Sequence, residues 1–86
     1  MNLGKKEEAM KLIDQSATPI LEYMKWCESL SKGHYKAVSS EFAMQLRLLN
    51  MTIEVLKQGG NEYKEERARY ETEFNKYYSY WRNRRG

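Results

Sequence analysis

Residues 35–61, YKAVSSEFAMQLRLLNMTIEVLKQGGN, decide the fold of this chain. Up to Lys57, an apolar side chain recurs every three or four positions, which is the period of an amphipathic α-helix. The Gly-Gly pair that follows is a strong stop signal, and Asn61 favours the N-cap of a new helix. The stretch therefore predicts a long helix over about 35–57, followed by a tight turn.

This predicted helix carries two apolar stripes that point in roughly opposite directions. The first stripe, which spans about one quarter of the circumference, is Val38, Phe42, Leu49, Ile53 and Leu56, with Tyr35 and Leu46 at its edge. The second stripe is Met44, Leu48, Met51 and Val55, at spacings of 4, 3 and 4. One interpretation is that the helix is central in a bundle, so that a neighbouring helix covers each stripe. The other is that the second stripe is an oligomer or partner surface, because methionine adapts to irregular partners.

A helix is also predicted upstream, over about residues 3–31. An unbroken seam with spacings of three and four residues runs along it. The seam is Met10, Ile13, Ala17, Ile20, Met24 and Cys27. Pro19 lies within the seam, where proline removes a backbone donor and crowds the preceding turn. Because the seam keeps its phase across Pro19, we expect one helix kinked near that residue; the alternative is two separate helices, the second of which starts at Thr18 and Pro19. Gly33 is expected to end this helix in the turn that follows.

The third predicted helix, over about 62–84, has an unusual set of apolar residues. It contains no Leu, Ile, Val or Met, and its apolar face is aromatic. Tyrosine, tryptophan and arginine dominate the energetics of protein interfaces, which favours partner contact near the end of this helix. The residues predicted to make that contact are Tyr77, Tyr78, Tyr80, Trp81, Arg82, Arg84 and Arg85. The alternative is that the aromatic face packs on the other helices, with its hydroxyl groups at the rim.

The three helices predict an all-α fold in a single domain over residues 1–86. Short connections favour antiparallel neighbours, so we expect an up-down-up three-helix bundle. The alternative is a long hairpin that completes its core by forming a dimer. A further line of apolar residues beside the seam of the first helix is assigned to the core, because bundle helices have wide apolar faces. This line is Leu12, Tyr23, Trp26 and Leu30.

Composition narrows the classes of function. The sequence has 86 residues and a net charge of +3. A chain of this length buries little more than about 60% of its unfolded surface, so it has no room for a deep substrate pocket. One cysteine, a charged N-terminal segment and the lack of an apolar run of about 20 residues together predict a cytoplasmic protein, or one in the cytoplasm of a host if a phage encodes it.

No motif for catalysis, metal binding or cofactor binding stands out. His34 and Cys27 cannot form a metal site by a known spacing, and Cys27 lies on the apolar seam, which indicates a buried, inert thiol. The Gly-Gly pair lacks the lysine and hydroxyl of a phosphate-binding loop. Most carboxylates have a basic residue three or four positions away, as in solvated helix pairs. We therefore expect no enzyme activity, no cofactor and no small-molecule substrate.

These observations predict a non-enzymatic protein-binding module that acts stoichiometrically, such as an inhibitor or adaptor of a larger protein machine. One alternative is nucleic-acid binding through the aromatic and arginine residues of 80–85. Another is a small structural assembly or scaffolding subunit. The chain is short and helical, contains methionine and tyrosine, and has no catalytic motif. In these general features it resembles phage accessory proteins, many of which block host machinery. The resemblance does not depend on a shared sequence motif.

Overall fold

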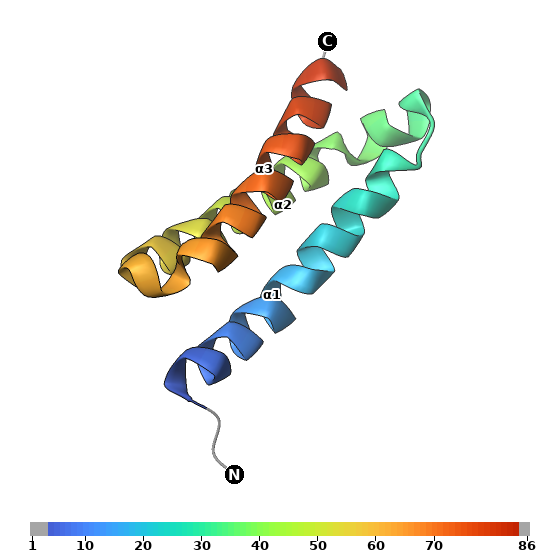
Figure 1. Ribbon diagram of the computed structural model, residues 1–86. Coiled ribbons are helices and arrows are strands. Elements are labelled where there is room, and N and C mark those ends of the chain that lie inside the picture. The colour runs from blue at the N-terminus through green and yellow to red at the C-terminus, as the bar shows by residue number, and fades with distance from the viewer. Residues whose placement is uncertain (1–3, 85–86) are drawn as a thin grey trace.

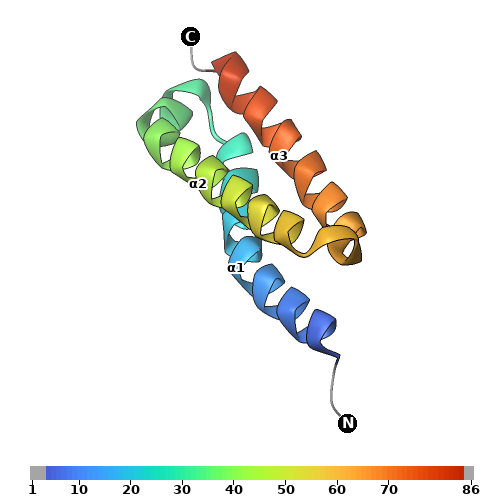
Figure 2. The ribbon, with the colours of Figure 1, turned by 90° about the vertical axis from the view of Figure 1, so that its left-hand side faces the viewer.

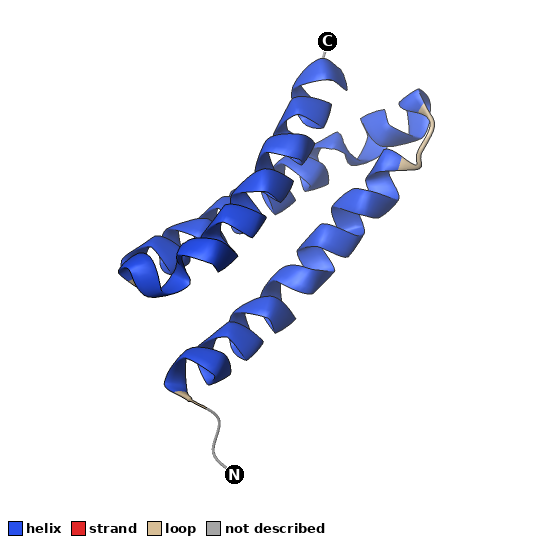
Figure 3. Ribbon diagram, viewed as in Figure 1, coloured by secondary structure: helices blue, strands red, loops and turns tan. Residues whose placement is uncertain are grey.

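The computed structural model describes residues 4–84, which form three long helices. These are α1 (Lys5–Glu28), α2 (Lys32–Gln58) and α3 (Lys64–Arg84), and a short 3₁₀ helix, η1 (Gly60–Tyr63), precedes α3. Consecutive helices run in opposite directions, and the start of α1 and the end of α3 lie at opposite ends of an elongated molecule of 49 × 23 × 15 Å (Figure 1). Only short connections interrupt the helices (Figure 3). The predicted all-α, three-helix bundle is confirmed.

The first connection differs from the prediction in its boundaries. α1 ends at Glu28 and α2 already begins at Lys32. The cause is Ser31, whose Oγ accepts a hydrogen bond from the backbone N–H of His34 (3.4 Å) and so caps α2. Gly33 and His34 therefore lie in the first turn of α2, and the predicted role of Gly33 as the residue that ends α1 is wrong.

α1 continues through Pro19 as one helix, as expected. Pro19 is exposed, so its ring lies on the side of α1 that faces away from the core. The preceding hydroxyl, Oγ1 of Thr18, donates a hydrogen bond to the carbonyl oxygen of Asp14 (2.7 Å). A kink at Pro19 stays a prediction.

The core lies along one side of α2, where the first stripe meets α1 and α3. Phe42 is fully buried at its centre, and its ring centroid lies 5.5 Å from that of Tyr35, 5.7 Å from that of Tyr80 and 6.3 Å from that of Tyr77. The buried side chains are Met10, Ala17, Met24, Cys27, Tyr35, Phe42, Leu46, Leu49, Ile53, Leu56, Tyr70 and Tyr77. Apart from Val38, which is half-buried, the first stripe is buried as predicted.

α2 contacts both other helices closely, whereas α1 and α3 meet only sparsely. Figure 2 shows the bundle from a second side, with α2 in front of part of α1. Polar groups join α1 to α3. Oδ1 of Asp14 accepts hydrogen bonds from the Tyr70 hydroxyl and from Nη2 of Arg69 (3.1 Å). Nearer the N-terminus, Nζ of Lys6 lies 3.5 Å from Oε2 of Glu66. α2 is therefore the central helix, and both neighbours lie against its core side.

The second apolar line of α1 lies only partly against the core, where all of it was assigned. Leu12 is 66% exposed and Trp26 is 52% exposed, while Tyr23 and Leu30 are half-buried. Because α1 packs closely on α2 alone, the seam of α1 is covered, whereas the positions beside it are covered only in part or not at all. The assignment of Leu12 and Trp26 to the core is therefore wrong.

The second connection is tighter than predicted. Gly60 has a positive φ of 67°, a conformation that favours glycine, and it begins η1. Asn61 lies inside η1, so its predicted role as the N-cap of α3 is wrong. The backbone of Gly59 faces the ring of Tyr63, and a Cβ on Gly59 would lie only 2.1 Å from Cδ2 of that ring.

We predict that Gly59→Ala lowers the free energy of unfolding by about 1–3 kcal/mol, because the methyl group forces the Tyr63 ring and the turn to shift. Urea denaturation followed by far-UV circular dichroism measures the change. Gly33→Ala is the matched control, because no atom lies within 4 Å of its added Cβ. Equal stability of the two variants would contradict the prediction.

Candidate protein-binding surface

The second stripe of α2 forms an open apolar surface, which we call the outer face of α2. Its four members, Met44, Leu48, Met51 and Val55, are 54%, 39%, 61% and 53% exposed. Their spacing places them on the side of α2 that faces away from the core stripe. α1 and α3 both pack against the core side, so neither covers this face. The interpretation that neighbouring helices cover both stripes is therefore wrong.

Two grooves border the outer face and widen the apolar surface. The α1–α2 groove, of about 520 Å³, is lined by Leu12, Ile13, Ser16, Ile20, Leu48, Met51, Thr52 and Val55. The α2–α3 groove, of about 550 Å³, is lined by Ala43, Leu46, Arg47, Asn50, Met51, Phe74, Tyr78 and Trp81. Met51 lines both grooves, so the apolar surface continues across α2 from one neighbour to the other.

Part of the aromatic end of α3 is structural, and one residue of the predicted partner contact is buried. Tyr77 is 2% exposed, packs on Phe42, and has Nζ of Lys76 4.9 Å from its ring centroid. The prediction that Tyr77 contacts a partner is therefore wrong. Tyr80 is half-buried, and its hydroxyl donates a hydrogen bond to the carbonyl oxygen of Cys27 (3.1 Å). Tyr80 thus ties α3 to the end of α1.

The arginines at this end differ in their surroundings. The guanidinium carbon of Arg84 lies 4.7 Å from the ring centroid of Tyr80 and 5.7 Å from that of Tyr35. Such cation–π contacts stabilise the packing of α3 on the start of α2. Arg82 is exposed, whereas Arg85 lies outside the described residues. Arg84 therefore contributes to the fold, and Arg82 remains accessible.

Tyr78 and Trp81 are the aromatic residues of this end that border the α2–α3 groove. Tyr78 is 42% exposed, and Trp81 is half-buried. Their ring centroids are 5.9 Å apart, and Tyr78 also stacks on Phe74 at 5.9 Å. With Arg47 across the groove, they combine the three residue types that most often dominate binding energy at interfaces.

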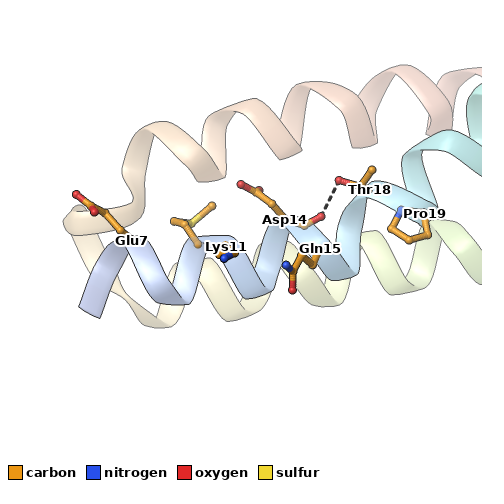
Figure 4. A pocket seen from close by; sticks show the side chains of 7 residues that line it. Glu7, Lys11, Asp14, Gln15, Thr18 and Pro19 are labelled. Carbon is orange, nitrogen blue, oxygen red and sulfur yellow. Dashed lines mark hydrogen bonds between the residues drawn. The ribbon is translucent and has the colours of Figure 1, made fainter. Parts of the chain in front are cut away.

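A shallow hollow on the outside of α1 is not a comparable site. It is lined by Glu7, Met10, Lys11, Asp14, Gln15, Thr18 and Pro19, all from one helix (Figure 4). Its central carboxylate, Asp14, already accepts hydrogen bonds from α3. A binding site needs polar groups that converge from several directions, which one helix surface does not provide.

The titratable side chains of the core are protonated and buried. Burial raises the pKa of the Cys27 thiol, which favours an unreactive thiol. Burial likewise raises the pKa of Tyr35 and of Tyr70 to about 12.

Across residues 4–84 no group of three or more His, Cys, Asp or Glu side chains could hold a metal ion. Nor does any helix in that range combine the length and apolar character needed to cross a membrane.

Comparison with known proteins adds no relative: no family model, no curated protein and no solved structure matches the chain.

Proposed function

We propose that the protein is a non-enzymatic protein-binding module that acts stoichiometrically, as an inhibitor or adaptor. The observation that carries the proposal is the outer face of α2, where four large aliphatic side chains remain 39–61% exposed on one side of a well-packed helix. Contiguous exposed apolar surface of this kind is typical of protein interaction sites. The bordering grooves add Leu12 on one side and Tyr78 with Arg47 on the other.

Binding to nucleic acid receives less support. Its predicted site depended on the arginines and aromatic residues at the end of α3. Tyr80 is hydrogen-bonded to α1, and Arg84 lies against two tyrosine rings. Each of these residues contributes to the fold, so fewer of them are free to contact phosphates or stack on bases.

The proposed setting is the cytoplasm, or the cytoplasm of a host cell for a phage-type protein. A single, buried cysteine suits a reducing compartment, in which structural disulfides are rare. An apolar helix face that occupies a groove on a larger protein would act by steric exclusion or by bridging, and neither mode requires chemistry.

The double substitution Met44→Asp and Leu48→Asp tests the proposal. We expect this variant to keep its helical content, because both side chains are exposed. We expect it to bind the protein partner at least about 30-fold more weakly, because buried interface anchors are worth about 2 kcal/mol or more. The comparison is affinity purification with quantitative mass spectrometry from the native cells, followed by calorimetry on the enriched partner.

A matched control adds the same charge elsewhere. Asn75→Asp and Ser79→Asp introduce two carboxylates on the exposed side of α3, away from the outer face of α2. This control is expected to retain the partner. If both double variants capture the same proteins as the original chain, the outer face of α2 is ordinary surface and the proposal is wrong.

A further inference from the structure

We propose that the outer face of α2 binds a second copy of this chain, with the two α2 helices antiparallel about a two-fold axis between Leu49 and Asn50. The inference rests on the proposed function, since it names a partner for the same surface. The side chains along that face are complementary to those of a second copy that runs in the opposite direction.

The apolar side chains match each other in this arrangement. The two-fold axis places Leu48 opposite Met51 of the second copy and Met44 opposite Val55 of the second copy. Each pair occurs twice, which gives four apolar layers at the alternating spacings of 4, 3 and 4 that a coiled-coil seam requires. Every layer joins a flexible methionine to a branched aliphatic side chain, so no layer is crowded by two branched residues.

The flanking charges fit the same register. Arg47 and Glu54 each precede a seam residue, Leu48 or Val55, on the α3 side of the outer face. In the antiparallel arrangement Arg47 faces Glu54 of the second copy, and the symmetry produces this pair twice. Arg47 makes no ion pair within residues 4–84, and Glu54 is held only by an exposed contact to Lys57 (3.2 Å). Parallel helices would instead place Arg47 opposite the uncharged Thr52, so the charges select the antiparallel arrangement.

The remaining flanking positions are compatible with close approach. On the α1 side, Gln45 faces Thr52 of the second copy, and neither side chain carries a charge. At each end of the seam, Glu41 faces Gln58 of the second copy, whose amide can donate a hydrogen bond to the carboxylate. Both end residues are exposed, so these polar pairs remain solvated. No like charges are opposed along the length of the seam.

The available apolar area lies at the lower bound of what a specific dimer buries. The four side chains of the outer face and Leu12 are 39–66% exposed, which amounts to on the order of 500 Å² of apolar surface per copy. Two copies would remove on the order of 1,000 Å² from water, and the flanking polar side chains add to this area. Leu12 contributes because it lies across the α1–α2 groove from Val55, beside the seam.

Charge-reversal variants test the register without disturbing the core, because both positions are exposed. Arg47→Glu places like charges opposite each other twice, and Glu54→Arg does the same with the opposite sign. We expect each single variant to dimerise roughly 10- to 30-fold more weakly than the original chain at low ionic strength. We expect the double variant to regain the original affinity, and an equimolar mixture of the two single variants to form heterodimers. Sedimentation equilibrium over a concentration series measures all of these affinities, and far-UV circular dichroism confirms the fold.

Each outcome decides between distinct conclusions. If the original chain is monomeric at the highest soluble concentration, self-association is wrong, while partner loss on Met44→Asp with Leu48→Asp would still support the proposed function. If the chain dimerises but the charge reversals change nothing, the antiparallel register is overturned. If the Met44→Asp and Leu48→Asp variant dimerises as tightly as the Asn75→Asp and Ser79→Asp control, the dimer uses another surface.

Discussion

Phe42→Ala is expected to lower the free energy of unfolding by about 3–5 kcal/mol, a large part of the about 5–15 kcal/mol that stabilises a typical domain. Phe42 is fully buried, and its ring contacts Tyr35, Tyr77 and Tyr80, which come from two helices. Three rigid aromatic rings cannot collapse easily into the space that the lost ring leaves. Most of the cavity therefore remains, so we expect the loss in free energy of unfolding to lie toward the upper end of about 3–5 kcal/mol.

Urea denaturation followed by far-UV circular dichroism tests this expectation at dilute protein concentration. Trp26→Ala is the control, because it also removes an aromatic ring, but one that is 52% exposed. We expect Trp26→Ala to lower the free energy of unfolding by no more than about 1 kcal/mol. Comparable losses for the two variants would show that the aromatic cluster around Phe42 is not the centre of stability.

A steep loss of stability is expected between about pH 10 and pH 12. Burial raises the pKa of Tyr35 and of Tyr70 to about 12, from the ordinary value of 10.0; for Tyr70, the hydrogen bond to Asp14 raises the pKa further. Between these two pH values the unfolded chain releases the phenolic protons while the folded chain retains them. The folded state then binds more protons, so the free energy of unfolding falls as pH rises, by up to about 1.4 kcal/mol per pH unit for each tyrosine.

Denaturant titrations at a series of alkaline pH values measure this slope. Tyr35→Phe is the informative variant, because the Tyr35 hydroxyl is buried and has no hydrogen-bond partner within the described part of the chain. Its removal is expected to be neutral or stabilising at pH 7 and to make the alkaline slope shallower. A free energy of unfolding that stays constant from pH 10 to pH 12 in the original chain would rule out the effect of burial.

The sequence predicts the helices well because their signals are local. The period of three and four residues and the Gly-Gly stop depend only on neighbouring positions. The boundary near Ser31 was missed because Ser31 and Gly33 both suit a helix end, and only the formed cap shows that Ser31 starts α2. Asn61 was misjudged for a related reason, since the 3₁₀ turn of η1 continues directly into α3.

The binding surface was harder to predict because it depends on how the helices meet. The second stripe of α2 was identified from spacing, but its exposure follows from both neighbours packing on the core side. Leu12 and Trp26 were misassigned because no local pattern shows that α1 and α3 barely meet. In α3, the neighbouring residues Tyr77 and Tyr78 lie on different sides of the helix, one buried and one exposed. Because aromatic residues occur on both sides of this segment, the type of residue does not show which side faces the core.

The burial of Cys27 also affects how the concentration of the protein in a cell would determine the fraction of paired chains. The sequence has this one cysteine, and its side chain is fully enclosed in the core. Two copies therefore have no exposed thiol with which to form a covalent link, and any pairing through α2 is reversible. The fraction of paired chains then follows expression level by mass action, so synthesis and degradation of the chain would set its dose.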